Sequence, residues 1–93
     1  MRVISNRPLV EFAETYPEAA APLQAWRRTL ETGVFTHFGD LKRAFGSVDK
    51  VGEWHVFNVG GNKWRVVAFL HFPAQICYVK HVFTHRQYDR WRP

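Results

Sequence analysis

Apolar residues in the first half of the chain recur every three or four positions, which is the spacing of one face of a helix. This spacing predicts three helices, over residues 8–15, 18–31 and 38–45. The longest of them carries an apolar stripe formed by Ala19, Leu23, Trp26 and Leu30. Such a stripe indicates a helix that packs one face on a core. A short strand over residues 1–5 is predicted to precede the helices.

The pattern becomes strand-like after residue 53. Three β-type runs follow one another there, over residues 54–59, 63–72 and 76–83. Gly60-Gly61-Asn62 supplies the positive φ angles of a hairpin turn between the first two runs. Residues 46–52 are predicted to be a polar connection, and Thr84 to cap a short C-terminal helix. This order predicts one α+β domain over residues 1–93, with the N-terminal strand and helices packed on one face of a small antiparallel sheet.

Alternation within the strands predicts how the two faces of the sheet differ, because successive side chains point to opposite sides. One set in the run 63–72 is wholly apolar and should face the helices: Trp64, Val66, Ala68, Leu70 and Phe72. Lys63 and Arg65 belong to the opposite set, so we expect them together on the open side. In the run 76–83, strict alternation groups His81 with Cys77, Val79 and Phe83, and Lys80 with Ile76, Tyr78 and Val82. The sequence leaves open which of these two groups is exposed.

Charge and composition narrow the classes of partner. The net charge is +5 and most of the basic residues are Arg, which favours phosphate or carboxylate recognition; an acidic protein partner would use the same charge. The one cysteine, Cys77, lies in an apolar run, so we expect a reduced, buried side chain. No apolar run approaches the roughly 20 residues that span a bilayer, and the N-terminus has no signal-peptide pattern. We therefore expect a cytoplasmic protein with no membrane partner.

The basic and titratable residues of the β region suit RNA cleavage without a metal ion. That reaction needs a base for the 2′-hydroxyl, cations for the charge that develops on phosphorus, and an acid for the leaving 5′-oxygen. Lys63 and Arg65 suit the cationic role. His85, His81 and Tyr88 are candidates for the proton transfers, because imidazole titrates near neutral pH. Asp89 could orient a neighbouring His or Arg.

The same residues also have structural interpretations. Lys63 and Arg65 beside a hairpin turn could form a solvated edge, and His81 in an apolar strand could be half-buried without a catalytic role. His81 and His85 have the spacing of a helical zinc pair, but they straddle a strand-to-helix junction and no second ligand cluster accompanies them. The remaining histidines are interpreted as structural: His37, His55 and His71. Trp26, Trp54 and Trp64 are expected in the core, whereas Tyr88 and Trp91 could stack on bases.

Two segments together resemble a known family. They are F-N-V-G-G-N-K-W-R-V-V at residues 57–67 and V-K-H-V-F-T-H-R-Q-Y-D at residues 79–89. This pair of motifs, with the N-terminal M-R-V-I-S and the two following helices, is similar to the HigB-type toxins, which belong to the RelE-like group of type II toxin–antitoxin systems. The family motif falls on Asn58, Gly60, Gly61, Asn62 and Arg65, and then on Thr84, His85, Tyr88 and Asp89.

The resemblance implies a RelE-like α+β fold and an mRNA endoribonuclease that inhibits translation, on the ribosome in many relatives. It also implies a cognate helix-turn-helix, HigA-like antitoxin, and contact with operator DNA only through the toxin–antitoxin complex. No cofactor or metal is expected. The predicted catalytic residues are Arg65, His85, Tyr88, Lys63 and His81. The predicted RNA-binding residues are Lys63, Arg65, Lys80, Arg86 and Asn62.

Two other functions remain open at this point. A non-catalytic module that binds RNA or the ribosome would block translation by occupancy and would use the same basic face, with an affinity that falls as salt rises. A protein-interaction domain would use the basic surface only to recruit an acidic partner.

Overall fold

A computed structural model describes residues 1–93. Its first part contains strand β1 (Arg2–Ile4), helix α1 (Arg7–Thr15), the 3₁₀ turn η1 (Pro17–Ala19), and helices α2 (Ala20–Thr32) and α3 (Phe38–Ala44). Its second part contains strands β2 (Asp49–Val51), β3 (Trp54–Val59), β4 (Trp64–His71) and β5 (Ile76–Thr84), and helix α4 (His85–Arg90). No helix is both long and apolar enough to cross a membrane.

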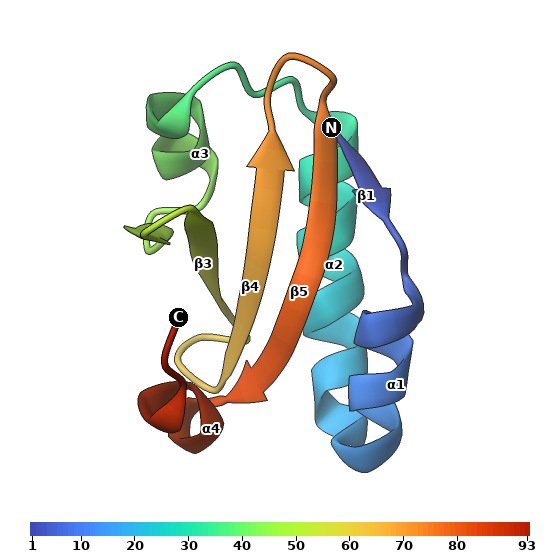
Figure 1. The fold of residues 1–93 in the computed structure, drawn as a ribbon. Coiled ribbons are helices and arrows are strands. Elements are labelled where there is room, and N and C mark those ends of the chain that lie inside the picture. Colours follow the sequence, from blue (N-terminus) through green and yellow to red (C-terminus); the bar gives the residue numbers. More distant parts are fainter.

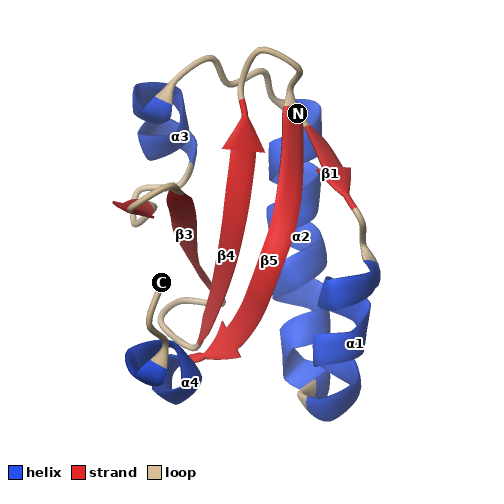
Figure 2. Ribbon diagram, in the orientation of Figure 1, coloured by secondary structure: helices blue, strands red, loops and turns tan.

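The five strands form one open sheet in the order β1-β5-β4-β3-β2. β1 pairs with β5 in parallel, and the other neighbours are antiparallel. In Figure 1, α2 lies behind β5 and α1 lies beside it, below β1. The front of β4 and β5 has no helix over most of its length. Figure 2 shows α4 at the lower end of these strands, opposite the β4–β5 hairpin. The predicted α+β fold, with helices on one face and a short C-terminal helix, is confirmed.

The turn between β3 and β4 depends on two glycines. Gly60 and Gly61 have φ angles of 64° and 69°, in the left-handed region that glycine adopts without a steric penalty. A Cβ atom on Gly60 would also lie 2.8 Å from Cδ1 of Trp64. The Gly-Gly pair therefore permits both the reversal of the chain and the close packing of Trp64 beneath it.

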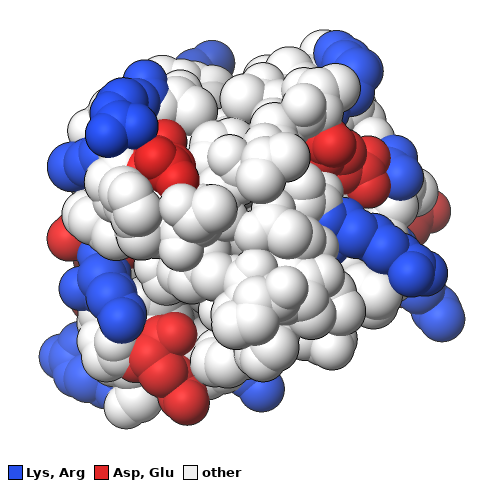
Figure 3. Space-filling model, turned by 90° about the horizontal axis from the view of Figure 1, so that it is seen from above, with Lys and Arg blue, Asp and Glu red and all other residues white.

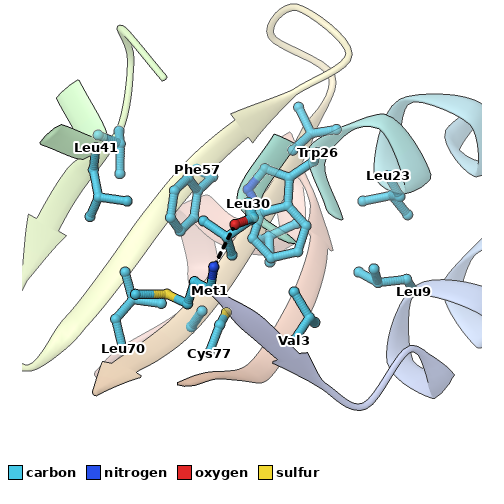
Figure 4. Packing of buried hydrophobic residues seen from close by; sticks show 14 of the residues in the cluster. Met1, Val3, Leu9, Leu23, Trp26, Leu30, Leu41, Phe57, Leu70 and Cys77 are labelled. Atoms are coloured by element: carbon cyan, nitrogen blue, oxygen red, sulfur yellow. Dashed lines mark hydrogen bonds between the residues drawn. The ribbon is translucent and has the colours of Figure 1, made fainter. Parts of the chain in front are cut away.

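The main hydrophobic core lies between the helices and the rear face of the sheet (Figure 4). The apolar set predicted on β4 faces this core, with Trp64, Val66, Ala68 and Leu70 buried and Phe72 packed against it. Helix α2 contributes the predicted stripe, in which Leu23 and Leu30 are fully buried. Cys77 is also fully buried, as expected, and burial raises the pKa of its thiol to about 12.

Strand β2 was not predicted. The segment over residues 46–52 was interpreted as a polar connection, but Asp49–Val51 pairs with β3 in antiparallel register. This strand has only three residues, two of them charged and exposed, so it lacks the apolar alternation that would reveal it in the sequence. It forms because the edge of β3 offers backbone groups that need partners.

A second difference is a β-bulge in β5. Val67 pairs with His81 and Ala68 pairs with Val79, so Lys80 has no partner in the register. The extra residue reverses the alternation that was extrapolated along the strand. His81 and Phe83 therefore face the open side, away from the core that Val79 and Val82 contact. The predicted grouping of His81 and Phe83 with Cys77 and Val79 is wrong for this reason.

Candidate active site

Arg65 of β4 lies on the open face of the sheet, but only 6% of its surface is exposed. Its Nη1 donates to the carbonyl oxygens of Asn62 and Trp64, at 3.1 and 3.2 Å. Its Nη2 donates to Oδ1 of Asn62 at 2.7 Å and contacts Nδ1 of His85 at 3.0 Å. The turn and its neighbours thus hold one guanidinium group in a fixed position beside an imidazole from another element.

His85 is the first residue of α4, and two interactions fix this helix end. Thr84 and Gln87 form a capping box, in which the backbone N–H of Gln87 donates to Oγ1 of Thr84 and the backbone N–H of Thr84 donates to Oε1 of Gln87. The backbone N–H of His85 donates to the carbonyl oxygen of Lys63 at 3.1 Å. The predicted cap at Thr84 is confirmed, and α4 is attached directly to the hairpin that carries Arg65.

The contact with Arg65 defines the tautomer of His85. A guanidinium has no acceptor, so Nδ1 must accept the hydrogen bond and the ring proton of a neutral imidazole lies on Nε2. Nε2 lies 3.6 Å from Oδ2 of Asp89, one turn along α4. The ring is therefore oriented by Arg65 through Nδ1, and half of the side chain remains exposed.

Tyr88 completes the group around Arg65. Its ring centroid lies 5.8 Å from the Cζ atom of Arg65, which is the range of a cation–π contact. Its ring also lies beside Trp91, with the centroids 6.0 Å apart. Arg65 of β4 is thus in contact with both His85 and Tyr88 of α4.

His81 and Lys63 occupy different positions. The His81 ring stacks on Phe83 with a centroid distance of 4.8 Å and lies 5.8 Å from the Trp91 ring. Burial, and secondarily the charge of Lys80, lowers the pKa of its imidazole. The Lys63 side chain is exposed, and its backbone rather than its ammonium group contacts α4. His81 therefore packs against Phe83 and Trp91 and not against Arg65. Lys63 lies at the edge of the site.

The predicted RNA-binding residues do not form one cluster. The side-chain oxygen of Asn62 accepts a hydrogen bond from Arg65, so this residue positions Arg65. Arg86 is exposed next to His85 on α4. Lys80 lies elsewhere on the open face, with its Nζ 5.8 Å from the ring centroid of Trp54. Lys63, Arg65 and Arg86 lie around one end of the sheet, whereas Lys80 lies on its middle.

Sequence reasoning missed two structural features around this site. Asn58 of β3 lies directly opposite Arg65 in the register, on the same face, although only its place in the family motif had distinguished it. Trp54, which was expected in the core, lies on the open face with Phe69 and is half-buried. Its distance of two residues from Val56 and four from Asn58 was the available signal, because all three share a face of β3.

The candidate site is a surface and not a deep pocket. The largest hollow, of about 530 Å³, lies at the opposite end of the molecule and is lined by residues of β1, the end of α2 and the β4–β5 turn. Seen from that end, the middle of the surface is uncharged, and Lys, Arg, Asp and Glu side chains lie around it (Figure 3). None of the predicted site residues lines this hollow.

Comparison with known proteins supports a single family. The family model for the HigB toxin, described as the RelE-like toxic component of a toxin–antitoxin system, matches residues 19–91, which include every predicted site residue. The chain belongs to the HigB toxin family. Its resemblance to this family, inferred above from residues 57–67 and 79–89, is confirmed.

Curated HigB relatives match almost the whole chain. The mRNA interferase toxin HigB of Escherichia coli strain K12 is 40% identical over 92 residues, which cover 96% of this chain and 88% of the relative. The mRNA interferase HigB of Shigella flexneri matches to the same extent. A HigB from Escherichia coli O6:H1 is 33% identical over 93 residues, covering 97% of this chain and 90% of the relative. This HigB-family chain thus matches its relatives across both the helical and the β parts.

Proposed function

We propose that the protein is the toxin of a type II toxin–antitoxin system and that it cleaves mRNA as a metal-independent endoribonuclease. The observation that carries this proposal is the 3.0 Å contact between Nη2 of Arg65 and Nδ1 of His85. It brings a phosphate-binding group and a proton-transfer group, predicted on separate elements, to one point. Membership of the HigB family and the printed names of the relatives support the same activity.

The geometry supports an order of events. In the free protein, Arg65 occupies the Nδ1 lone pair of His85, so the imidazole cannot accept a proton there. An RNA phosphate competes for the Arg65 N–H groups, because charge-assisted bonds to phosphate are stronger than bonds to a neutral imidazole. Substrate binding therefore frees Nδ1 to take the proton from the 2′-hydroxyl. Arg65 then stabilises the charge that develops on the phosphoryl oxygens.

Tyr88 is the proposed proton donor to the leaving 5′-oxygen. Its ring lies against Arg65, and its hydroxyl is carried by the same helix as His85. Attack by the 2′-oxygen on phosphorus, with departure of the 5′-oxygen, gives a 2′,3′-cyclic phosphate and a 5′-hydroxyl end. Lys63, exposed at the edge of the site, and Arg86 hold neighbouring phosphates. His81 contributes through the aromatic cluster that supports Trp91.

Induction of the protein in growing bacteria tests this proposal. The unmodified protein should arrest growth, and Arg65→Ala and His85→Ala should relieve the arrest at equal expression. Loss of a general acid or base lowers the cleavage rate by roughly 10²- to 10⁴-fold. Arg28→Ala, at an exposed arginine of α2, is the matched control and should remain toxic. Full toxicity of both site variants would contradict the assignment.

Primer extension on cellular mRNA distinguishes cleavage from occupancy. New 5′ ends that depend on His85 support the endoribonuclease. Growth arrest with intact transcripts would instead support the alternative, a module that binds RNA or the ribosome and blocks translation without cutting. That alternative has one structural observation in its favour, since four hydrogen-bonding contacts already engage the Arg65 guanidinium.

The proposed biological setting is the cytoplasm, where the substrate is mRNA on the ribosome. The proposed partner is a helix-turn-helix, HigA-like antitoxin, and operator DNA is contacted only through the complex. Co-expression of the product of the adjacent reading frame should restore growth and co-purify with the protein. If no neighbouring product suppresses the toxicity, this part of the proposal is wrong.

A further inference from the structure

The open face carries a second group of side chains, distant from Arg65. Trp54 of β3, Phe69 of β4 and Tyr78 of β5 form a row across three strands, with 6.4 Å between the ring centroids of each neighbouring pair. Tyr78 is 45% exposed, which is unusual for an aromatic residue in the middle of a sheet. Nζ of Lys80 lies 5.8 Å from the centroid of the Trp54 ring. These four residues are called the aromatic row below.

The core between the helices and the sheet does not include the aromatic row. None of its four members belongs to the main buried cluster or to the partly buried residues packed against it. The bulge at Val67/Ala68 leaves Lys80 without a strand partner, and the Lys80 ammonium group reaches across the sheet to Trp54. Bulges commonly serve to re-aim a side chain. The chain thus places three aromatic rings and a cation outside the core that the helices cover.

The aromatic row is continuous with the candidate active site. It occupies the same face of β3, β4 and β5 as Arg65, and the stacked rings of His81 and Phe83 lie between the two. The strand from Tyr78 to His85 spans on the order of 20 Å, at about 3.3 Å per residue. Apart from α4 at its lower end, this face carries no helix in Figure 1. A flexible polymer bound at Arg65 can therefore follow the open face to the aromatic row.

We propose that the aromatic row binds unpaired bases of the substrate RNA, several nucleotides from the bond that is cut. This inference rests on the proposed function. Aromatic rings on an open sheet are a general platform for single-stranded RNA, because every base can stack on them whatever its sequence. Lys80 supplies the positive charge that a phosphate backbone requires. The row therefore adds affinity and positions the substrate, whereas the chemistry stays at Arg65, His85 and Tyr88.

Binding of labelled single-stranded RNA to the full-length His85→Ala protein tests the proposal, since this variant should leave the substrate uncut. Two oligonucleotides, about 2 and about 12 nucleotides long, differ in whether they can reach from the site to the row. The longer one should bind more tightly. Adding Tyr78→Ala should weaken its binding by roughly 5- to 100-fold, as expected for one lost stacking contact, and leave the shorter one unchanged. Tyr78→Phe keeps the ring and should bind like the parent.

Two further variants separate stacking from charge and from general surface effects. Lys80→Gln should reduce the slope of log affinity against log salt by about one for the longer RNA. Val10→Ala is the control, because Val10 is an exposed apolar residue on α1 with 49% of its surface accessible, and it should change neither affinity. Circular dichroism on each variant establishes that the sheet is intact.

The outcomes separate this proposal from the proposed function. If the longer RNA binds no better than the shorter one, or if Tyr78→Ala loses no affinity for it, the aromatic row does not bind RNA, even if the unmodified protein cleaves mRNA. A second outcome is that the longer RNA binds more tightly and loses that advantage in Tyr78→Ala while the unmodified protein leaves RNA intact. That result would support RNA binding by the aromatic row and contradict the proposed endoribonuclease activity. If Tyr78→Ala weakens binding of the antitoxin but not of RNA, the aromatic row is a protein-docking surface and the proposal is wrong.

Discussion

The two faces of the sheet each bury one polar residue, and the two residues differ in their hydrogen bonding. On the helix-covered face, His55 is 3% exposed and neither of its ring nitrogens has a hydrogen-bond partner. On the open face, Arg65 is 6% exposed and takes part in four hydrogen-bonding contacts. Burial alone therefore does not distinguish the candidate site residue Arg65 from His55. The hydrogen-bond partners around the buried group do.

The surroundings of the two residues explain the difference. His55 packs between the rings of Phe38 and Phe72, each 5.9 Å away, which offer its ring nitrogens no hydrogen bond. Arg65 lies where the hairpin, α4 and the Tyr88 ring meet. Helices pack on the covered face, and the core formed there stabilises the fold. The open face is covered only in part, by aromatic side chains of β5 and the C-terminal segment, and keeps polar groups accessible.

The largest effect is expected from a cavity on the covered face. Phe57 is fully buried between the rings of Trp26 and Phe45. Phe57→Ala should lower the free energy of unfolding by about 3–5 kcal/mol, much of what a domain of this size possesses. Urea unfolding followed by circular dichroism measures the change. A loss below about 1.5 kcal/mol would show that the helices do not form a tight core on this face.

A smaller loss of stability is expected from the open face, together with a loss of activity. Arg65→Ala removes hydrogen bonds made by a charged, buried group and should cost about 2 kcal/mol of unfolding free energy as well as cleavage. His85→Ala should abolish cleavage and leave stability nearly unchanged, because half of the His85 side chain is exposed. Equal destabilisation by both variants would indicate that the contact is mainly structural.

The buried histidine of the covered face should make the stability of the protein depend on pH. Burial, and secondarily the charge of Lys50, lowers the pKa of His55 below 6.5, so the folded protein holds the imidazole neutral. Below about pH 6.5 the unfolded chain binds a proton that the folded protein resists, and the free energy of unfolding falls as pH falls. His55→Leu should remove the His55 share of this loss and leave the share of His81, whose pKa is also lowered. It should stabilise the protein at pH 7 by about 1 kcal/mol, because two unpaired nitrogens disappear.

Thermal unfolding between pH 5 and pH 8 checks this prediction. The variant and the unmodified protein should diverge as the pH drops below 6.5. His71→Leu, at an exposed histidine, serves as the control and should keep the acid-dependent loss. Parallel curves for His55→Leu and the unmodified protein would contradict the role assigned to His55.

The smallest expected change concerns the cap of α4. Thr84→Ala removes the side-chain acceptor for the Gln87 backbone N–H and should cost about 0.5–1 kcal/mol. Since His85 and Tyr88 are carried by this helix, the cleavage rate should fall more than the small stability loss implies. Thr84→Ser should retain both properties, because its hydroxyl can cap in the same way. Unchanged cleavage in Thr84→Ala would show that α4 keeps its position without the cap.

Much of the fold followed from local patterns. The helical stripe of α2 and the wholly apolar set on β4 identified the covered face, because a long periodic pattern is a strong signal of burial. The Gly-Gly turn and the cap at Thr84 were also readable, since both have specific local chemistry. Strand β2 and the bulge were not. The first is too short and polar to show a period, and the second is an insertion that only the pairing with β4 reveals.

The sequence alone determined that this chain has a basic β region on one side of a helix-covered sheet, and it identified Arg65, His85 and Tyr88 as candidates. These features depend on residue type, spacing and motif, which are local properties. Tertiary structure decided that Nη2 of Arg65 lies 3.0 Å from Nδ1 of His85, although twenty positions separate them in the chain. It also turned His81 toward the open face. Both outcomes depend on strand pairing and on the docking of α4. These contacts join segments that are far apart in the sequence, so the spacing of residues along the chain does not define their distance in space.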